Sequence, residues 1–303
     1  MTALRRAMHA LEGLSVGDAF GQCFFQQGDG DNHLGAGELP PAPWFFTDDT
    51  LMALSVVDQL ARHGRIEQDE LALDFAARYD YDRAYGPSMH RVLARIGNGE
   101  PWRAVATGGF EGQGSWGNGA AMRVAPLGAF FADDLAAAKE QAARSAEITH
   151  AHPEGVAGAV AVALASALAV RARAAGTPPS PAGFLEEIVS GLPPSEVRSR
   201  IARARSITSA DSVQFAVSVL GNGVGMSAQD TVPYALWCAA HSLDDFARAL
   251  WATVAAGGDR DTMCAIAGGV VASFTGADGI PAEWRARREP LPDWFRHALT
   301  GQP

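Results

Sequence analysis

Apolar residues recur at helical spacing along most of the 303-residue chain, and this pattern constrains the fold more than any other feature. No run of alternating β-branched residues is long enough to predict a strand. The sequence therefore predicts an all-α protein, a compact orthogonal helical bundle in a single domain over residues 1–303. The helical spacing, or a run rich in alanine, is seen in Leu51–Arg62, Asp69–Tyr79, Asp134–Ile148, Val156–Ala175, Ser195–Ser206, Ala210–Leu220 and Asp244–Ala256.

Several boundary signals accompany these segments. Ser242 and Asp245 have the spacing of a capping box before the last helix. Gly64 follows the first helix and the pair Gly257-Gly258 follows the last, as glycines do at helix ends. The stretch AAGTPPSPAG, from Ala174 to Gly183, predicts an exposed loop.

Charge and cysteine content narrow the class of function. The net charge of −10 argues against an extended nucleic-acid surface, although one nucleotide in a pocket stays compatible with it. Cys23, Cys238 and Cys264 predict neither a disulfide framework nor a zinc site, so we expect a reducing, cytoplasmic setting. The N-terminal 21 residues predict an amphipathic helix rather than a secretory signal. The uncharged stretch Gly155–Val170 is shorter than the roughly 20 residues of a membrane span, so we expect a helix inside the bundle.

Two clusters of acidic and hydroxyl residues precede predicted helices far apart in the sequence. One is Thr47-Asp48-Asp49-Thr50 and the other is Asp259-x-Asp261-Thr262. Capping explains a single cluster, because Asp and Thr oxygens accept from free N–H groups at a helix start. Two carboxylates exceed what a cap needs, and a divalent cation would offset their repulsion. Oxygen ligands suit Mg²⁺, Mn²⁺ or Ca²⁺, and four carboxylates suffice for two ions if the clusters meet in space.

The ordered motifs resemble the ADP-ribosylglycohydrolase family. From Gly13 to about Gly276 the chain carries GLSVGDAFG, TDDT, GSWGNGAAMRVAPLG, ITHAHPEGVAGA and GGDRDT, in the family's order. The resemblance implies the family's all-α fold and a dinuclear centre of Mg²⁺ or Mn²⁺. Its ligands would be Thr47, Asp48, Asp49, Asp259, Asp261 and Thr262.

The resemblance also implies how the substrate is held. Trp116 would stack on adenine, with a packed core tryptophan as the alternative. His150 would lie near the ribose and phosphates, whereas His152 is more readily explained by capping or packing. Asp18 would lie near the site, either contacting ligand or ordering the metal-binding loop. The diphosphate would be cradled by donors of the glycine-rich loop, unless that loop is a plain turn: Ser115, Gly117, Asn118 and Gly119.

Two positions depart from the family pattern. Phe25 stands where many members have a glutamate seven residues after the early aspartate, and the nearest acids are Asp29, Asp31 and Glu38. Arg260 stands where threonine is common, and would face solvent, pair with an acid or contact a phosphate.

The resulting hypothesis is hydrolysis of the glycosidic bond at ribose C1″ of an ADP-ribosylated protein, nucleic acid or small molecule, with release of ADP-ribose. Asp48 or Asp49 would act as the general base. Two alternatives stay open. One is a catalytically silent ADP-ribose-binding protein on the same fold, which Phe25 favours and the intact acidic set opposes. The other is a hydrolase of a different ribosylated small molecule.

Overall fold

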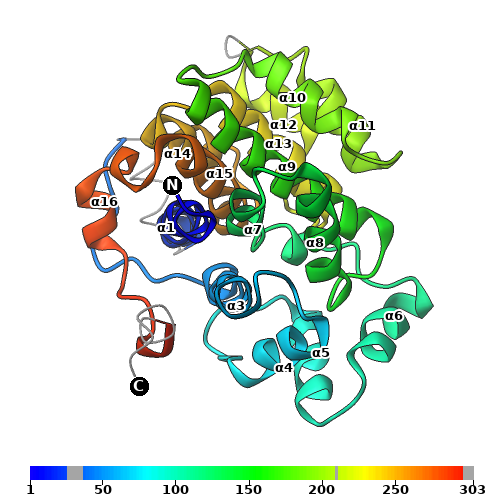
Figure 1. The fold of residues 1–303 in the computed structure, drawn as a ribbon. Coiled ribbons are helices and arrows are strands. Elements are labelled where there is room, and N and C mark those ends of the chain that lie inside the picture. The colour runs from blue at the N-terminus through cyan, green and yellow to red at the C-terminus, as the bar shows by residue number, and fades with distance from the viewer. Residues whose placement is uncertain (26–36, 209–210, 296–303) are drawn as a thin grey trace.

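A computed structural model of the chain describes residues 1–25, 37–208 and 211–295 (Figure 1). The described residues contain helices and no β-strand, and two isolated bridges join Trp44 to Arg288 and Gly117 to Ser227. The prediction of an all-α fold is confirmed. A large cluster of buried apolar side chains includes residues from Leu11 to Phe295.

The helices follow one another along the chain, most of them with short connections. They are α1 (Ala3–Gln22), η1 (Cys23–Phe25), α3 (Asp48–His63), α4 (Gln68–Ala77), α5 (Pro87–Gly97), α6 (Trp102–Gly112), η2 (Asn118–Ala120), α7 (Ala125–Phe130), α8 (Leu135–Glu147), α9 (Pro153–Ala175), α10 (Pro181–Ser190), α11 (Glu196–Ala204), α12 (Val213–Leu220), α13 (Ala228–His241), α14 (Phe246–Val254), α15 (Arg260–Thr275), η3 (Ala277–Gly279) and α16 (Ala282–Arg287).

Helices α1 and α15 pack unusually closely along a seam of glycines, and Figure 1 shows them side by side. A Cβ atom built on Gly13, Gly17 or Gly21 would lie 2.2–2.4 Å from a backbone carbonyl oxygen of α15. Gly13 faces Gly268, and Gly17, one turn further along α1, faces Cys264, one turn closer to the start of α15. The helices are therefore antiparallel, and the end of α1 meets the beginning of α15.

Helix α9 forms the apolar centre of the second half of the bundle. It is long and apolar enough to cross a membrane, but 83% of its most apolar window is buried inside the protein. The uninterrupted buried run from Ala157 to Val170 is typical of a core helix that is enclosed on all sides.

The segment that leads into α3 is held by the C-terminal part of the chain. Trp44 O accepts from Glu289 N at 2.9 Å. The Glu289 carboxylate accepts from Phe46 N at 3.0 Å and pairs with Arg83. The Arg83 carbonyl in turn accepts from Asp48 N at 2.8 Å. The first residue of α3 is thus tied to two segments that are distant in sequence.

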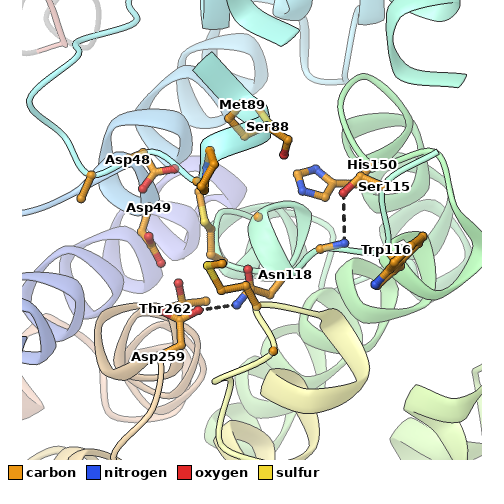
Figure 2. A pocket seen from close by; sticks show the side chains of 18 of the residues that line it. Asp48, Asp49, Ser88, Met89, Ser115, Trp116, Asn118, His150, Asp259 and Thr262 are labelled. Atoms are coloured by element: carbon orange, nitrogen blue, oxygen red, sulfur yellow. Dashed lines mark hydrogen bonds between the residues drawn. The ribbon is translucent and has the colours of Figure 1, made fainter. Parts of the chain in front are cut away.

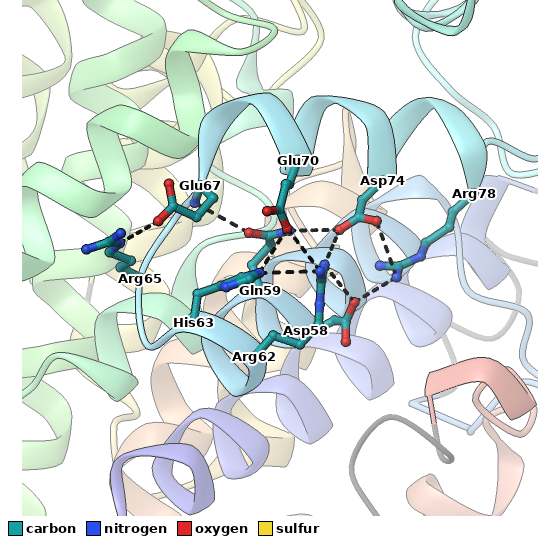
Figure 3. Close-up of polar contacts among 9 residues, drawn as sticks. All are labelled: Asp58, Gln59, Arg62, His63, Arg65, Glu67, Glu70, Asp74 and Arg78. Carbon is teal, nitrogen blue, oxygen red and sulfur yellow. Dashed lines mark hydrogen bonds and ion pairs between the residues drawn. The ribbon is translucent and has the colours of Figure 1, made fainter. Parts of the chain in front are cut away.

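An ion-pair network fastens α4 to the far end of α3 (Figure 3). Arg62 on α3 contacts Glu70 at 3.1 Å and Asp74 at 2.6 Å, both on α4. Asp58, almost fully buried, receives Arg78 at 2.7 Å and Arg62 at 3.3 Å. The network therefore joins both helices through one buried carboxylate.

Most predicted helix boundaries agree with the structure, and one predicted cap is wrong. Gly64, at φ 67°, ends α3 as expected. Ser242 is the C-cap of α13 and not part of a capping box; Asp245 alone caps α14, accepting from Arg248 N at 3.0 Å. The predicted Ala174–Gly183 loop is shorter, because α9 continues to Ala175 and α10 already begins at Pro181.

Candidate functional site

The N-terminus of α3 carries the early acidic cluster. Thr47 is the N-cap, and its Oγ1 accepts from Asp49 N at 3.4 Å. Asp48 and Asp49 occupy the first turn, and all three side chains are buried. One hydroxyl satisfies the cap, so capping leaves the two carboxylates unexplained.

Asp18, on α1, organises the backbone at this helix start. It is completely buried and accepts from the backbone N–H groups and hydroxyls of Thr47 and Thr50, at 2.6–3.1 Å. Burial raises the pKa of Asp18 to about 6, although these hydrogen bonds oppose the rise. Asp18 does not line the cavity described below. Its carboxylate therefore holds the start of α3 from behind the cavity wall.

The late acidic cluster begins α15. Asp259 is the N-cap, and Asp261 and Thr262 lie buried in the first turn. The preceding Gly258 has φ 64°, and a Cβ there would lie 2.0 Å from the Asn222 carbonyl oxygen. Only glycine fits this turn, which brings Asp259 past the 221–226 loop.

The two clusters meet at the junction of α1, α3 and α15. Single carboxylate oxygens of Asp18, Asp49 and Asp261 all lie within 4.8 Å of one another. Asp48, Asp49, Asp259, Asp261 and Thr262 line one cavity. The antiparallel glycine seam causes this convergence, because it sets the end of α1 against the start of α15.

The electrostatics of this cluster fit a cation. Burial first, and then the Asp18 and Asp259 carboxylates, raises the pKa of Asp48. The pKa of Asp49 is raised by burial and then by the carboxylates of Asp18 and Asp261. The pKa of Asp261 is raised by burial and then by the carboxylate of Asp259. Asp49 Oδ1 is also a buried oxygen without a hydrogen-bond partner. The carboxylates repel one another, and one of their oxygens has no partner. A hard divalent cation, which prefers oxygen ligands, would relieve both conditions.

A cavity of about 480 Å³ opens beside the acids (Figure 2). Figure 2 shows Asp48, Asp49, Asp259 and Thr262 on one side. Ser115, Trp116 and His150 lie on the opposite side, and Asn118 lies between the two sides, next to Asp259. Gly117 and Gly119, also expected from the sequence, line the same cavity. Of the expected site residues, Thr47 and Asp18 lie behind the cavity wall and the others line it.

The glycine-rich loop is joined directly to the acidic cluster. Asn118 Nδ2 donates to Asp259 Oδ2 at 2.5 Å and to Thr231 Oγ1 at 2.9 Å. Ser115 Oγ accepts from Gly117 N at 3.1 Å, which shapes the turn. Asn118 therefore orients an acid, a role beyond the ligand contact expected for it.

His150 lies buried against this loop. A Cβ on Gly119 would lie 2.9 Å from its ring, so glycine permits the contact. Burial, and then the nearby Arg123, lowers the pKa of His150 to about 3, and the ring is neutral at physiological pH. His152 caps α9, with its Nδ1 accepting from Glu154 N at 3.1 Å.

Sequence patterns missed two walls of the cavity. The first is the loop and start of α5, with Ala84, Gly86, Pro87, Ser88, Met89 and Arg91. The second is the GNGVGM loop at 221–226, whose alternating glycines are the signal that was available. Phe110 also lines the cavity, 4.9 Å from Trp116 between ring centroids.

Backbone strain gathers around the same cavity. Four non-glycine residues have positive φ among the described residues, and three of them, Ala84, Phe110 and Met226, line it. Such conformations cost of order 1–3 kcal/mol each and concentrate at ligand sites.

Neither of the two departures from the family pattern lies in the wall of the cavity. Phe25 is 46% exposed and does not line it. Arg260 donates to Phe24 O at 2.9 Å and to Val254 O at 3.2 Å, so it ties α15 to η1. Asp29 and Asp31 lie outside the described residues, and Glu38 is exposed.

Comparisons with known proteins find a matching family model and similar chains. The ADP-ribosylglycohydrolase family model matches residues 1–301. The human "ADP-ribosylhydrolase ARH3" is 29% identical over 279 residues, covering 80% of this chain and 74% of that protein. The Bos taurus protein of the same name is 30% identical over 273 residues, covering 79% and 73%.

A solved structure shares the fold. An "ADP-ribosylglycohydrolase-related protein complex" superimposes with a TM-score of 0.68 at 24% identity, covering 98% of this chain and 96% of that one. At this identity the likeness establishes the helical architecture alone.

Proposed function

Because the chain belongs to the ADP-ribosylglycohydrolase family, and is thus a glycosidic hydrolase, we propose that it cleaves the ribose C1″ bond of ADP-ribosylated substrates in a metal-dependent reaction. Free ADP-ribose is the product. The observation that carries the proposal is the convergence of the Asp49 and Asp261 carboxylates, from opposite ends of the chain, beside a cavity of about 480 Å³.

The proposed cofactors are two divalent cations, Mg²⁺ or Mn²⁺. The residues that would hold them offer only oxygen ligands: Thr47, Asp48, Asp49, Asp259, Asp261 and Thr262. When bound, such ions act as Lewis acids and lower the pKa of water. Asp49 Oδ1, which has no hydrogen-bond partner, supports this assignment. A bound cation would offset the free-energy cost of burying this charged oxygen.

Asp48 and Asp49 are the proposed catalytic residues. Water attacks C1″, the bond from C1″ to the acceptor breaks, and a carboxylate takes the proton that water loses. The acceptor leaves with its bonding electrons and takes up that proton, which returns the carboxyl group to its charged form. The negative charge of the two carboxylates would stabilise the oxocarbenium-like transition state.

The opposite wall is proposed to bind ADP-ribose. Backbone N–H groups of the loop from Ser115 to Gly119 would meet the diphosphate. The neutral His150 would donate one further hydrogen bond. Trp116 would stack on adenine, with Phe110 beside it. Asp18 is proposed to order the start of α3 rather than contact ligand, because it lies behind the cavity wall.

The acceptor is proposed to be a modified protein side chain, nucleic acid or small molecule. A panel of ADP-ribosyl-arginine, ADP-ribosyl-serine and ADP-ribosylated nucleic acid, each incubated with Mg²⁺ or Mn²⁺, tests this. Release of ADP-ribose that Asp49→Asn removes supports the proposal. Binding of ADP-ribose without release from any member of the panel would replace the proposal with the catalytically silent binding protein. Cleavage confined to ribosylated small molecules that are not ADP-ribosyl compounds would replace it with the other alternative.

A further inference from the structure

A short chain of hydrogen bonds runs from a buried arginine to the ligand cavity. Arg123 Nη2 donates to Thr149 Oγ1 at 3.0 Å, and that oxygen lies 2.7 Å from His150 Nδ1. Arg123 is completely buried and has no ion-pair partner among the described residues. A second bond from Nη2 to Ser145 O, at 2.7 Å, holds the guanidinium in place.

The chemistry of these groups decides the direction of each bond. A guanidinium can only donate, so the Thr149 hydroxyl accepts from Arg123. In the described part of the chain, Arg123 and His150 are the two side-chain partners of this hydroxyl. Its single proton has one possible acceptor among these two partners, His150 Nδ1, and a bond there leaves the ring proton on Nε2.

We propose that Thr149 is a positioning residue: its hydroxyl, oriented by Arg123, holds His150 as the neutral Nε2-protonated tautomer, with that N–H facing the ligand cavity.

The position of Nε2 agrees with this role. A Cβ built on Gly117 or Gly119 would lie 3.0 or 3.1 Å from Nε2, so this edge of the ring abuts the glycine-rich loop. His150 also lines the cavity. The Nε2–H group joins the backbone N–H groups of the loop as a fixed donor for an oxygen-rich ligand. The low pKa of the ring, caused by burial and then Arg123, keeps it neutral.

This inference rests on the proposed function only where it expects ADP-ribose at that donor. The tautomer itself is a property of the free protein. Long-range ¹H–¹⁵N spectra of ¹⁵N-histidine-labelled protein, without metal or nucleotide, read it directly, and His150→Gln assigns the signals. We expect the pattern of an imidazole with a protonated Nε2 and an unprotonated Nδ1 at neutral pH. A proton on Nδ1, or a charged ring, overturns the inference whatever the protein hydrolyses.

Three variants extend the test. Thr149→Val should give a mixed or reversed tautomer and weaken ADP-ribose binding about tenfold, the effect of roughly one hydrogen bond. Thr149→Ser keeps the hydroxyl and should match the wild type. Thr253→Val removes an equally buried hydroxyl on α14, outside the cavity wall, and controls for general loss of packing. A wild-type tautomer in Thr149→Val, or equal weakening in all three variants, contradicts the inference.

Discussion

Gly17 lies so close to Cys264 that a Cβ at position 17 would sit 2.2 Å from the Cys264 carbonyl oxygen. This contact is the middle of the seam between α1 and α15, and it sets the distance between the acids that those helices carry. The same two glycine-rich helices therefore determine both the packing of the bundle and the geometry of the proposed cation site.

Replacing Gly17 by alanine should destabilise the protein by about 1–3 kcal/mol, because the added methyl group forces the helices apart. Helix propensity alone predicts the opposite sign, a gain of up to ~1 kcal/mol. Urea unfolding measures the difference. Gly97→Ala on α5 is the matched control, since its Cβ would lie 3.7 Å from Ala76, an ordinary contact. Equal effects of the two substitutions would mean that the seam is not tight.

Divalent cations should raise the free energy of unfolding, because they relieve repulsion between buried carboxylates. At one hundred times the dissociation constant the gain is about 2.7 kcal/mol. Thermal shift and titration calorimetry with Mg²⁺ and Mn²⁺ measure it. Asp49→Asn and Asp261→Asn should abolish the gain, and Asp244→Asn, at an exposed position, should keep it. Persistent binding in both cavity variants would exclude the proposed ligand set.

Removing the Asn118 amide should weaken cation binding by about 10–100-fold, the usual effect of losing a group that orients a ligand. The reason is the 2.5 Å bond from Asn118 to Asp259 Oδ2. Calorimetry on Asn118→Ala measures the change, with the exposed Asn98→Ala as control. An unchanged cation affinity would show that Asp259 needs no such support.

His150 should make stability fall with acid between pH 6.5 and about 3. Its folded pKa is lowered to about 3, so in this range the unfolded chain binds a proton that the folded protein does not. The contribution is complete above pH 6.5 and is lost as the pH falls, with a slope of up to about 1.4 kcal/mol per unit. Urea unfolding of wild type and His150→Gln at several pH values isolates it. Parallel pH profiles would mean that His150 titrates alike in both states.

Asp58 should contribute more to stability than the exposed ion pairs. It receives two arginines while almost fully buried, so Asp58→Asn should cost about 2 kcal/mol, in the range of hydrogen bonds to charged groups (Figure 3). Glu67→Gln removes the partner of Arg65, which is 68% exposed, and should cost less than about 1 kcal/mol. Chemical unfolding of both variants makes the comparison, and equal losses would contradict the assigned burial effect.

Local patterns predicted the helical class and the acidic motifs, because both depend on residues near one another in sequence. The spacing around Asp48 and Asp259 was enough to suggest two half-sites. The wall formed by Ser88 could not be predicted, since its place depends on how distant segments pack, whereas the alternating glycines before Met226 were a signal that was not used. The place of Phe110 in the cavity wall was not predicted for another reason. Its positive φ interrupts α6, and no feature of the local sequence predicts this strained conformation. For Asp18 the sequence left two roles open, and the four donors around its carboxylate favour the ordering role.

The carboxylates of the cluster lie at both ends of the chain, from Asp18 to Asp261, and this spacing has a consequence for biosynthesis. About 240 residues separate them. At roughly 5–20 residues per second, a ribosome needs on the order of 10 to 50 s to deliver the last acid after the first. A nascent chain therefore lacks part of the proposed cation site until Asp261 has been synthesised, and ions bound there could stabilise the protein only after that point.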